Sequence, residues 1–306
     1  MKISVIGAGN VGSLSAMRIA GEGLGDVLLI DVVKGLACGK ALDLEDARPI
    51  LRHNYNIKGS DDIQLVKGSD IVVVTAGLAR RPGMSREELL AKNAQILKDV
   101  CLNVKELAKD AIVIIVTNPL DIMTLYALKT TGFKPQKLFG MGISLDIARF
   151  ANLISQELGL LCTDIEALVI GAHGEGMMPL PSFTKVKGVA LDEFMNEDKI
   201  KALVSRTINR GAEIVANLGT GSAFFAPSAA IAAIVKTIAK DEKRIIGLCS
   251  YLNGEYGIKN TCIGVPCRLG KEGIEKVIEL ELSQEEKAKL HKSAMLVSQA
   301  AEQLLA

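Results

Sequence analysis

The sequence has 306 residues, of which 49% are apolar and 23% are charged. This apolar fraction excludes an intrinsically disordered chain, because such chains bury too little apolar surface to offset the entropy lost on folding. Lysine and arginine together number 36 and aspartate and glutamate 35, so the formal net charge is +1. The lack of a basic excess argues against a nucleic-acid-binding protein, and no apolar run approaches the roughly 18 residues of a membrane span.

The start of the sequence and its cysteines favour the cytoplasm. The first expected strand begins at Lys2, which leaves no room for a secretory signal. The six cysteines include no C-x-x-C pair, and a chain of this length does not need disulfide bonds for stability. We therefore expect reduced cysteines that are buried in the core. With three histidines and no Cys/His cluster, we expect no metal site.

Short apolar runs alternate with helical patterns in the first half of the chain. The predicted strands cover residues 2–7, 27–31, 71–75 and 111–117, and helices are predicted at 10–23 and 34–50. A further helix, between the last two strands, is predicted to start at Ser85, because Glu88 completes a capping box. Continuous valine and isoleucine runs are typical of strands buried on both faces of a parallel sheet. The order βαβαβ predicts an α/β fold with a doubly wound parallel sheet of the Rossmann type.

The second half of the chain has a different pattern. It predicts strands at 138–141, 165–170, 244–252, 260–266 and 273–280, and helices at 143–158, 197–217 and 227–240. The last three strands are expected to form an antiparallel sheet, with Asn253-Gly254 as a hairpin turn between the first two. Ser283 and Glu286 form the capping box of a final helix. We predict a Rossmann domain at residues 1–143 and an α+β substrate domain at 144–306.

A glycine-rich motif follows the first predicted strand and opens the first predicted helix. It has the order G-x-G-x-x-G and consists of Gly7, Ala8, Gly9, Asn10, Val11 and Gly12. Its glycines allow a tight turn and let the backbone approach a pyrophosphate at the helix N-terminus. Asp31 ends the second strand, where a carboxylate accepts hydrogen bonds from the adenosine ribose and repels a 2′-phosphate. We therefore expect NAD rather than NADP as the cofactor.

Two further segments follow predicted strands at their carboxyl ends, where ligands bind in open α/β sheets. Residues 78–86 contain Arg80, Arg86, a glycine and a proline, and this segment is predicted to close over a ligand as a lid. A solvated basic loop is the alternative. Asn118 is a candidate for hydrogen bonds to a substrate or to the nicotinamide ribose, and the bond between Asn118 and Pro119 is a candidate cis peptide. An ordinary strand-ending turn is the alternative there.

A histidine, an aspartate and an arginine complete the candidate set. Asp146 and Arg149 share one face of a predicted helix, either in a site or as a surface ion pair. His173 follows a predicted strand; a lone histidine is more often structural, but its flanking glycines favour an accessible ring. Hydride transfer from an alcohol to NAD needs a base such as histidine, a carboxylate that fixes its tautomer, and arginines that bind a substrate carboxylate.

Several longer motifs occur in order along the chain. They are VTNP at 116–119, LDIARF at 145–150, HG at 173–174, GAEIV at 211–215, GSAFFAP at 221–227 and YLNGEYG at 251–257. Together with the glycine motif they resemble the lactate/malate dehydrogenase family over nearly the whole chain, in particular the lactate-dehydrogenase-like malate dehydrogenases of bacteria. The resemblance implies reversible hydride transfer between (S)-malate and NAD, an activity of the tricarboxylic acid cycle. It also implies a homodimer or a homotetramer.

The resemblance implies a role for each candidate side chain. His173 would accept and donate the proton, with Asp146 as its partner. Arg149 would bind the C1 carboxylate, and Arg86, arriving with the lid, would polarise the ketone. Arg80 would pair with the second carboxylate of malate or oxaloacetate, because malate dehydrogenases of this family carry arginine there and lactate dehydrogenases typically carry glutamine.

The resemblance also concerns the residues around the cofactor, and the chain differs from the family pattern at one place. The resemblance implies that Asn118 contacts the substrate and that Asn93, Val116 and Asn118 line the cofactor site. The family usually follows its catalytic His-Gly with Asp and then Thr or Ser, whereas this chain has Glu175-Gly176. A lactate or broader 2-hydroxy acid dehydrogenase is the alternative with the same fold. A non-catalytic NAD-binding module is the alternative from a different functional class.

Overall fold

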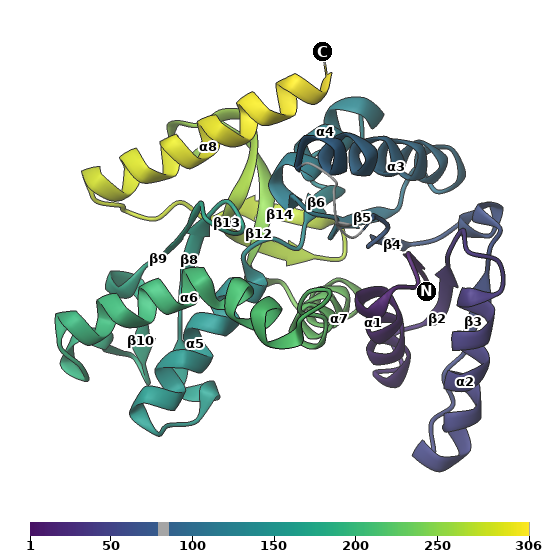
Figure 1. Cartoon of the computed structure of the whole chain (residues 1–306), viewed down its shortest axis with the longest axis horizontal. Helices are drawn as coiled ribbons and strands as arrows, with labels where there is room; N and C mark the ends of the chain where they lie inside the picture. The colour runs from purple at the N-terminus through teal and green to yellow at the C-terminus, as the bar shows by residue number, and fades with distance from the viewer. Residues whose placement is uncertain (79–85, 306) are drawn as a thin grey trace.

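The structure of the chain, a computed structural model, describes residues 1–78 and 86–305 (Figure 1). The strands of its first half are β1 (Lys2–Ile6), β2 (Asp26–Ile30), β3 (Ile57–Ser60), β4 (Ile71–Val74), β5 (Ile112–Ile115) and β6 (Leu138–Gly140). The helices between them are α1 (Asn10–Gly21), α2 (Leu36–Leu51), the 3-10 helix η1 (Ile63–Val66), α3 (Arg86–Leu107) and α4 (Leu120–Thr131).

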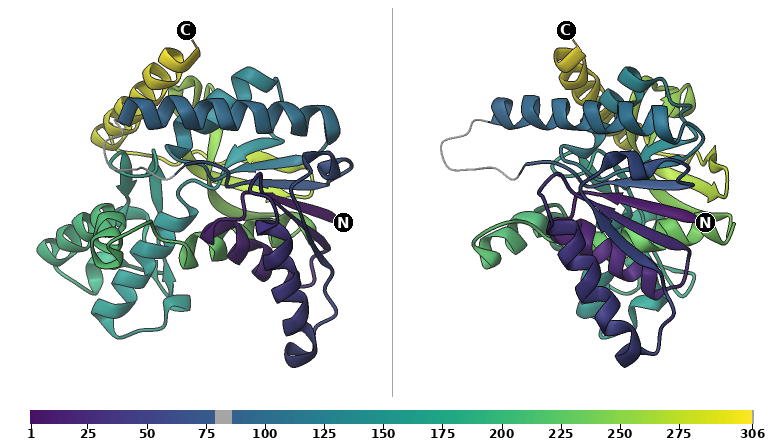
Figure 2. Two further views of the ribbon diagram at one scale, coloured as in Figure 1. Left: turned by 45° about the vertical axis from the view of Figure 1, so that its right-hand side comes forward. Right: turned by 90° about the vertical axis from the view of Figure 1, so that its right-hand side faces the viewer.

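These six strands form a parallel sheet in the order β3-β2-β1-β4-β5-β6. β4 and β5 are the apolar runs IVVV and IVII, and every residue in both strands is buried. Strands of this kind need cover on both faces. The helices supply it, with α3 and α4 on one face and α1 and α2 on the other (Figure 2). The doubly wound sheet predicted from the sequence is confirmed.

The second half begins with α5 and ends with a long C-terminal helix. Its first elements are α5 (Ser144–Leu158), η2 (Cys162–Asp164), β7 (Ile165–Glu166), β8 (Val169–Gly171), β9 (Met177–Pro179), η3 (Pro181–Phe183), β10 (Lys185–Val186), β11 (Val189–Ala190) and η4 (Leu191–Glu193). They are followed by α6 (Glu197–Leu218), α7 (Phe225–Ala239), β12 (Arg244–Asn253), η5 (Glu255–Gly257), β13 (Lys259–Gly270), β14 (Gly273–Val277) and α8 (Gln284–Leu305).

The two predicted capping boxes have different outcomes. At the start of α8, the Ser283 N–H donates to Glu286 Oε2 at 2.8 Å, and the Glu286 N–H donates to Ser283 Oγ at 3.3 Å. This capping box is confirmed. The box predicted at the start of α3 involves Ser85, which lies outside the described residues.

The strands of the second half extend the parallel sheet. β12 pairs antiparallel with β6 through Cys249 and Gly140, and the sheet continues through β13 to β8 and β9, with β14 beside β13. Gly140 permits this approach, because a Cβ at that position would lie only 2.9 Å from the Cβ of Cys249. The expected antiparallel strands are therefore present, but they belong to one sheet that runs through both halves of the chain.

Helices from the two halves also pack on each other. α7 lies against α1, and α8 lies against α4 (Figure 1). A smaller core cluster, which includes Phe150, Leu153 and Leu203, joins α5 to α6. α5 is thus held between the main sheet and α6, and this packing fixes the direction of the side chains on its buried face.

Three local predictions differ from the structure. The strand predicted at 165–170 is two strands, because β7 pairs with β10 whereas β8 pairs with β9 and β13. β3 is not predicted, since its sequence IKGS has one large apolar residue; it forms because Gly59 lies directly against the backbone of Ala37. The connection from β12 to β13 is also longer than a two-residue turn, because the 3-10 helix η5 lies between them.

The cysteines follow the prediction only in part. Cys101, Cys249, Cys262 and Cys267 are free and buried, as expected. Cys162 is exposed, so the prediction of a buried core residue is wrong there, and Cys38 is only half-buried. The reason is that Cys162 begins the short helix η2 at the surface, where its thiol contacts Ser155 Oγ at 3.3 Å.

Candidate active site

The carboxyl edge of the parallel sheet gathers the residues predicted to bind the cofactor. Gly7 follows β1, Asp31 follows β2 and Val116 follows β5, and these strands lie close together in the sheet. Because parallel strands all end at the same edge, residues that are far apart in the sequence meet there. This is the edge at which open α/β sheets bind ligands.

The glycines of the motif have different roles. Gly7 has a φ of +106°, and a Cβ there would lie 2.6 Å from Thr75 Oγ1. A Cβ at Gly12 would overlap the carbonyl oxygen of Gly7. A Cβ at Gly9 would meet no atom within 4 Å. Gly7 and Gly12 therefore let the loop pack on itself and on the end of β4, whereas Gly9 borders open space.

The start of α1 fits a bound phosphate group. Asn10 is the first residue of the helix, Gly9 is its N-cap, and no side chain caps it. The N–H groups of Asn10, Val11 and Gly12 in the first turn thus have no capping acceptor, and they lie at the positive end of the helix dipole. A pyrophosphate supplies the acceptors and the negative charge that such a helix end binds.

Asp31 is held in a fixed orientation beside this loop. Its Oδ2 accepts the N–H of Ala8 at 2.6 Å, and its Oδ1 accepts the N–H of Val33 at 2.9 Å. Each carboxylate oxygen keeps further acceptor capacity, which suits the two hydroxyl groups of an adenosine ribose. The described residues of this edge therefore fit a dinucleotide with a free ribose.

Lys40 was not expected at this site. Its Nζ donates to the carbonyl oxygen of Ala8 at 2.6 Å and to Ser13 Oγ at 3.1 Å, so α2 places a positive charge behind the glycine loop. The sequence shows only one lysine in an amphipathic helix, which is most often a solvent-exposed residue. The contact depends on how α2 packs, and no local motif indicates it.

Three other predicted cofactor residues have distinct surroundings. Asn93 on α3 is buried, and its Oδ1 accepts the N–H of Leu78 at 2.7 Å while its Nδ2 donates to the Leu78 carbonyl at 3.3 Å. Asn93 therefore fixes the chain where it enters the predicted lid. Val116 is buried after β5, and Asn118 is exposed two residues later, with the predicted cis peptide to Pro119.

His173, Asp146 and Arg149 form one buried cluster. His173 Nδ1 lies 2.7 Å from Asp146 Oδ2, and Arg149 Nη1 donates to Asp146 Oδ1 at 3.1 Å. The Asp146 side chain is fully buried, while those of Arg149 and His173 are 10% and 16% exposed. The ion pair expected as an alternative does form, but it is buried and shared with the histidine. The Asp146 carboxylate fixes the tautomer in which a neutral His173 carries its proton on Nδ1.

The cluster changes the acidity of the histidine. Burial alone would lower the pKa of His173, but the hydrogen bond and charge of Asp146, together with the charge of Asp121, raise it above its ordinary value. Arg149 opposes this effect through its own positive charge. The ring is therefore a stronger base than a free imidazole, which suits a group that takes a proton and returns it.

Asp121 is a second carboxylate that the sequence did not reveal. It lies in the first turn of α4, it is 3% exposed, and its Oδ2 accepts the backbone N–H of His173 at 2.7 Å. Burial raises the pKa of Asp121. An acidic residue in a first helical turn is usually explained by the helix dipole, so its position gives no sign of a contact with His173.

Arg149 keeps part of its hydrogen-bonding capacity free. Its Nε is buried and has no hydrogen-bond partner among the residues the structure describes. Gly211 of α6 lies beside the guanidinium, since a Cβ there would be 3.7 Å from Nη1. A buried donor without an acceptor is costly. The exposed tenth of the side chain can offer its remaining guanidinium N–H groups to a ligand carboxylate, because the guanidinium fork matches carboxylate geometry.

The side chains of the two remaining arginines of the predicted site lie outside the part of the chain that the structure describes. Arg80 lies in the segment 79–85, outside the described residues, and the same holds for the side chain of Arg86. Their predicted roles stay predictions. The described site is therefore one half of the expected site, namely the sheet edge and the cluster on α5 and after β8.

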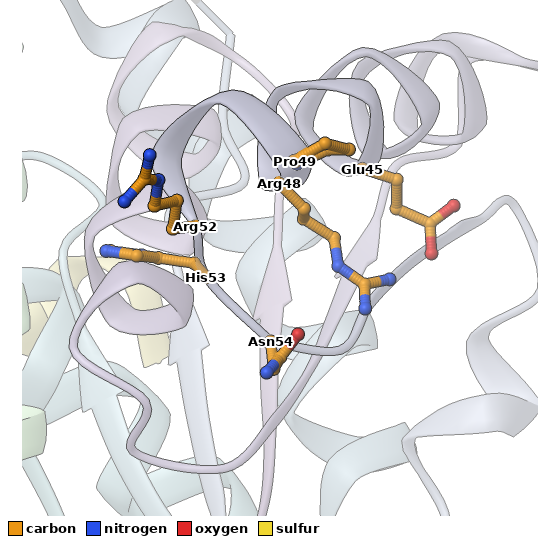
Figure 3. Close-up of a pocket in the computed structure, with 6 residues that line it drawn as sticks. All are labelled: Glu45, Arg48, Pro49, Arg52, His53 and Asn54. Carbon is orange, nitrogen blue, oxygen red and sulfur yellow. The ribbon is translucent and has the colours of Figure 1, made fainter.

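A hollow in the surface lies elsewhere, at the C-terminal end of α2 (Figure 3). It measures about 450 Å³ and is lined by Glu45, Arg48, Pro49, Arg52, His53 and Asn54. None of these residues belongs to the sheet edge or to the His173 cluster. We assign it no part in the chemistry described here.

Residues 1–140 match the lactate/malate dehydrogenase NAD-binding domain, and residues 143–306 match the alpha/beta C-terminal domain of the same family. The chain belongs to the lactate/malate dehydrogenase family. It is an NAD-dependent oxidoreductase of that family, and NAD is the cofactor for which the glycine loop and Asp31 are suited.

Members of the lactate/malate dehydrogenase family resemble this chain along its whole length. A malate dehydrogenase of Methanosarcina mazei is 48% identical over 294 residues, which is 96% of each chain. The solved malate dehydrogenase of Salinibacter ruber is 40% identical, with a TM-score of 0.95 over 100% of this chain and 98% of that one. The lactate dehydrogenase of Cryptosporidium parvum, solved with lactic acid and NAD, is 36% identical, with a TM-score of 0.95 over 99% and 97%. The fold alone therefore does not distinguish the two substrates.

Among the residues that the structure describes, no helix is both long and apolar enough to cross a membrane. Within the same residues, no three His, Cys, Asp or Glu side chains come together as a metal site would require.

Proposed function

We propose that the chain is a cytoplasmic, NAD-dependent malate dehydrogenase, which interconverts (S)-malate and oxaloacetate. The observation that carries the proposal is the buried cluster of His173, Asp146 and Arg149, which combines a base with a carboxylate-binding group. Relatives named malate dehydrogenase, at 46% to 48% identity over nearly the full length, support malate as the substrate.

The proposed chemistry follows from the protonation states of the cluster. NAD, when bound by the glycine loop and Asp31, would supply the acceptor for the hydride from the malate carbon that carries the hydroxyl. His173 takes the hydroxyl proton on Nε2, because its Nδ1 is engaged with Asp146. Asp146 then stabilises the imidazolium, and Arg149 holds the C1 carboxylate through donors that Asp146 does not use. In the reverse direction, the same imidazolium returns the proton to the forming alkoxide.

The proposed cofactor contacts lie at the sheet edge. The glycine loop, with the N–H groups of Asn10 and Val11, would hold the pyrophosphate, and Asp31 the adenosine ribose. Asn93, Val116 and Asn118 would line the nicotinamide side. Asn118 would also reach the substrate, since it is exposed at the end of its strand.

We assign to Arg80 the selection of a dicarboxylate substrate, through an ion pair with its second carboxylate. We assign to Arg86 the polarisation of the ketone oxygen that reacts. A monocarboxylate would leave Arg80 without a partner in the closed site. Its binding would then be weaker by about 2–5 kcal/mol, so the site would reject it. We expect Arg80→Gln to lower kcat/KM for oxaloacetate and to raise relative activity on pyruvate. Arg244→Gln is the matched control, because Arg244 is an exposed arginine at the start of β12, outside the described site and outside α2. An unchanged ratio of the two activities in Arg80→Gln would remove Arg80 from this role.

A lactate or broader 2-hydroxy acid dehydrogenase is the second candidate. The likeness to the Cryptosporidium parvum lactate dehydrogenase favours it, because that enzyme matches this chain with the same TM-score as a malate dehydrogenase. Arg80 is the residue that argues for malate. Initial rates on malate and lactate distinguish the candidates directly.

We further propose a homodimer or homotetramer and a division into domains at residue 143. Helix α2 supports the assembly, because it exposes three large apolar side chains, Leu42, Ile50 and Leu51, at 61%, 84% and 54%. Apolar surface of this kind is typical of an interface. Sedimentation analysis of the wild type, and of a variant with Ile50→Lys, tests the assembly.

A further inference from the structure

The segment that carries His173 is short and rich in glycine. It connects Gly171, the last residue of β8, to Met177, the first residue of β9. Gly171 and Gly174 have φ values of +95° and +101°, and Gly176 ends the segment. Glycines give a backbone wide conformational freedom, so a segment with this composition needs restraints from outside to hold one geometry.

One side chain of the C-terminal helix joins both ends of this segment. Ser293 of α8 accepts the N–H of Ala172 on its Oγ at 3.2 Å, and the same hydroxyl donates to the carbonyl oxygen of Gly176 at 3.1 Å. Ser293 is 8% exposed. α8 contacts both β8 and β9, so the hydrogen bonds of Ser293 are part of a packed interface.

Gly176 lies so close to Ser293 that a larger residue would collide with the serine. A Cβ at Gly176 would lie 2.7 Å from Ser293 Oγ and 3.0 Å from the Cβ of Ala172. The φ of Gly176 is not in the left-handed region, so its backbone conformation does not require glycine. The hydroxyl of Ser293, which lies nearest, and the Cβ of Ala172 together leave no space for a side chain there.

The contacts with Ser293 complement those made by the two buried carboxylates. Asp146 holds the imidazole ring, and Asp121 holds the N–H of His173 itself. Neither of them fixes the residues on each side of the histidine. Ser293 binds the residue before His173 and the last residue of the segment, so the three contacts together fix the ring, its own backbone and the segment ends.

We propose that Ser293 is a positioning residue for His173, and that Gly176 and Ser293 act as a matched pair through which α8 sets the geometry of the catalytic segment. The inference rests on the proposed function only for the role of His173 as the base. A small displacement of such a base costs rate while substrate binding, which depends on Arg149, changes little.

The first test compares Ser293→Ala with Ser298→Ala. Ser298 lies on the same helix and has no hydrogen bond to the His173 segment, so it is the matched control. We expect Ser293→Ala to lower kcat for malate oxidation about 10- to 100-fold with KM changed less than about threefold. Ser298→Ala should match the wild type. Ser293→Cys, which keeps the volume but is a weaker donor, should fall between wild type and Ser293→Ala.

A second test reads the histidine directly and needs no turnover. The chain has three histidines, so His173→Asn assigns the His173 imidazole signal in an NMR titration. A displaced ring loses part of its contact with Asp146, and the groups facing it are Asp146, Asp121 and Arg149. We expect the pKa of His173 to be lower in Ser293→Ala than in the wild type, by roughly half a pH unit or more.

A double-mutant cycle tests the matched pair. Gly176→Ala should reduce kcat strongly in the presence of Ser293, and less when combined with Ser293→Ala, because the hydroxyl that collides with the new Cβ is gone. A merely structural serine would lower the melting temperature and leave kcat and the pKa of His173 unchanged, and that result would overturn the proposal. If the wild type fails to oxidise malate but the His173 signal still responds to Ser293→Ala, the proposed function fails and the positioning role stands.

Discussion

The glycine loop after β1 and the His173 segment after β8 position their chemistry in different ways. In the first, the groups that meet the ligand are backbone N–H groups, and Gly7 and Gly12 are glycine because the chain packs on itself there. In the second, the working group is one imidazole, whose ring contacts Asp146 of α5 while the backbone N–H of His173 donates to Asp121 of α4. The first site therefore depends on local shape, and the second depends on charge pairs assembled across the fold.

The largest expected effect is the loss of the base. His173→Asn keeps a polar side chain of similar size but cannot take a proton near neutrality. We expect kcat for malate oxidation to fall about 10²- to 10⁴-fold, while the Kd for NADH, measured by fluorescence titration, stays at the wild-type value. A loss below tenfold would mean that another group acts as the base.

The next effect concerns the carboxylate behind the histidine. In malate oxidation His173 must be neutral, and Asp146 raises its pKa above the ordinary 6.5 despite the opposing effect of burial. The rate should therefore fall as the pH drops through an apparent pKa above 6.5. Asp146→Asn should lower kcat about 10²-fold and move this acidic limb to lower pH. A pH profile that keeps its acidic limb in Asp146→Asn would contradict the pairing.

The glycine loop predicts a loss of stability rather than a change in acidity. Gly12→Ala places a Cβ against the Gly7 carbonyl, so we expect unfolding to become easier by about 3 kcal/mol or more. Gly9→Ala has open space and a φ of −68°, so its stability should be within about 1 kcal/mol of wild type while NADH binding weakens. Equal unfolding free energies for the two variants in urea would show that the loop does not pack as described.

The smallest expected effect belongs to Lys40. Its charge lies behind the loop and acts on a pyrophosphate from a distance. We expect Lys40→Met to raise the Kd for NADH about two- to fivefold, with a weaker dependence on salt than in the wild type. If Lys40→Met has the wild-type Kd for NADH at low ionic strength, then Lys40 only binds Ala8 and Ser13 and does not contribute to cofactor binding.

The same contrast explains what could be predicted from the sequence. The glycine motif and Asp31 lie within one βαβ unit, so spacing alone predicts where they meet. The buried runs at β4 and β5 likewise predict the parallel sheet. β3 was not predicted because its four residues show neither an apolar run nor a regular alternation. Its formation depends on Gly59 packing against α2.

The proposed catalytic cluster was predictable only in its most visible members. His173, Asp146 and Arg149 stand in recognisable motifs, but Asp121 and Ser293 do not. Both reach the His173 segment from elements that are distant in the sequence, and each resembles an ordinary helix residue when read locally. Contacts of this kind follow from how α4 and α8 pack on the sheet, and no short-range signal encodes that packing.

The most direct test of the whole account is a comparison of initial rates for the wild-type protein on (S)-malate and (S)-lactate, each with NAD and with NADP. We predict that malate with NAD exceeds lactate with NAD by at least about 100-fold in kcat/KM, as expected if the role proposed for Arg80 holds and lactate leaves it without a carboxylate partner. NADP should be the poorer cofactor, because Asp31 repels a 2′-phosphate. Preference for lactate, or the absence of NADH formation with either acid, would contradict the assignment.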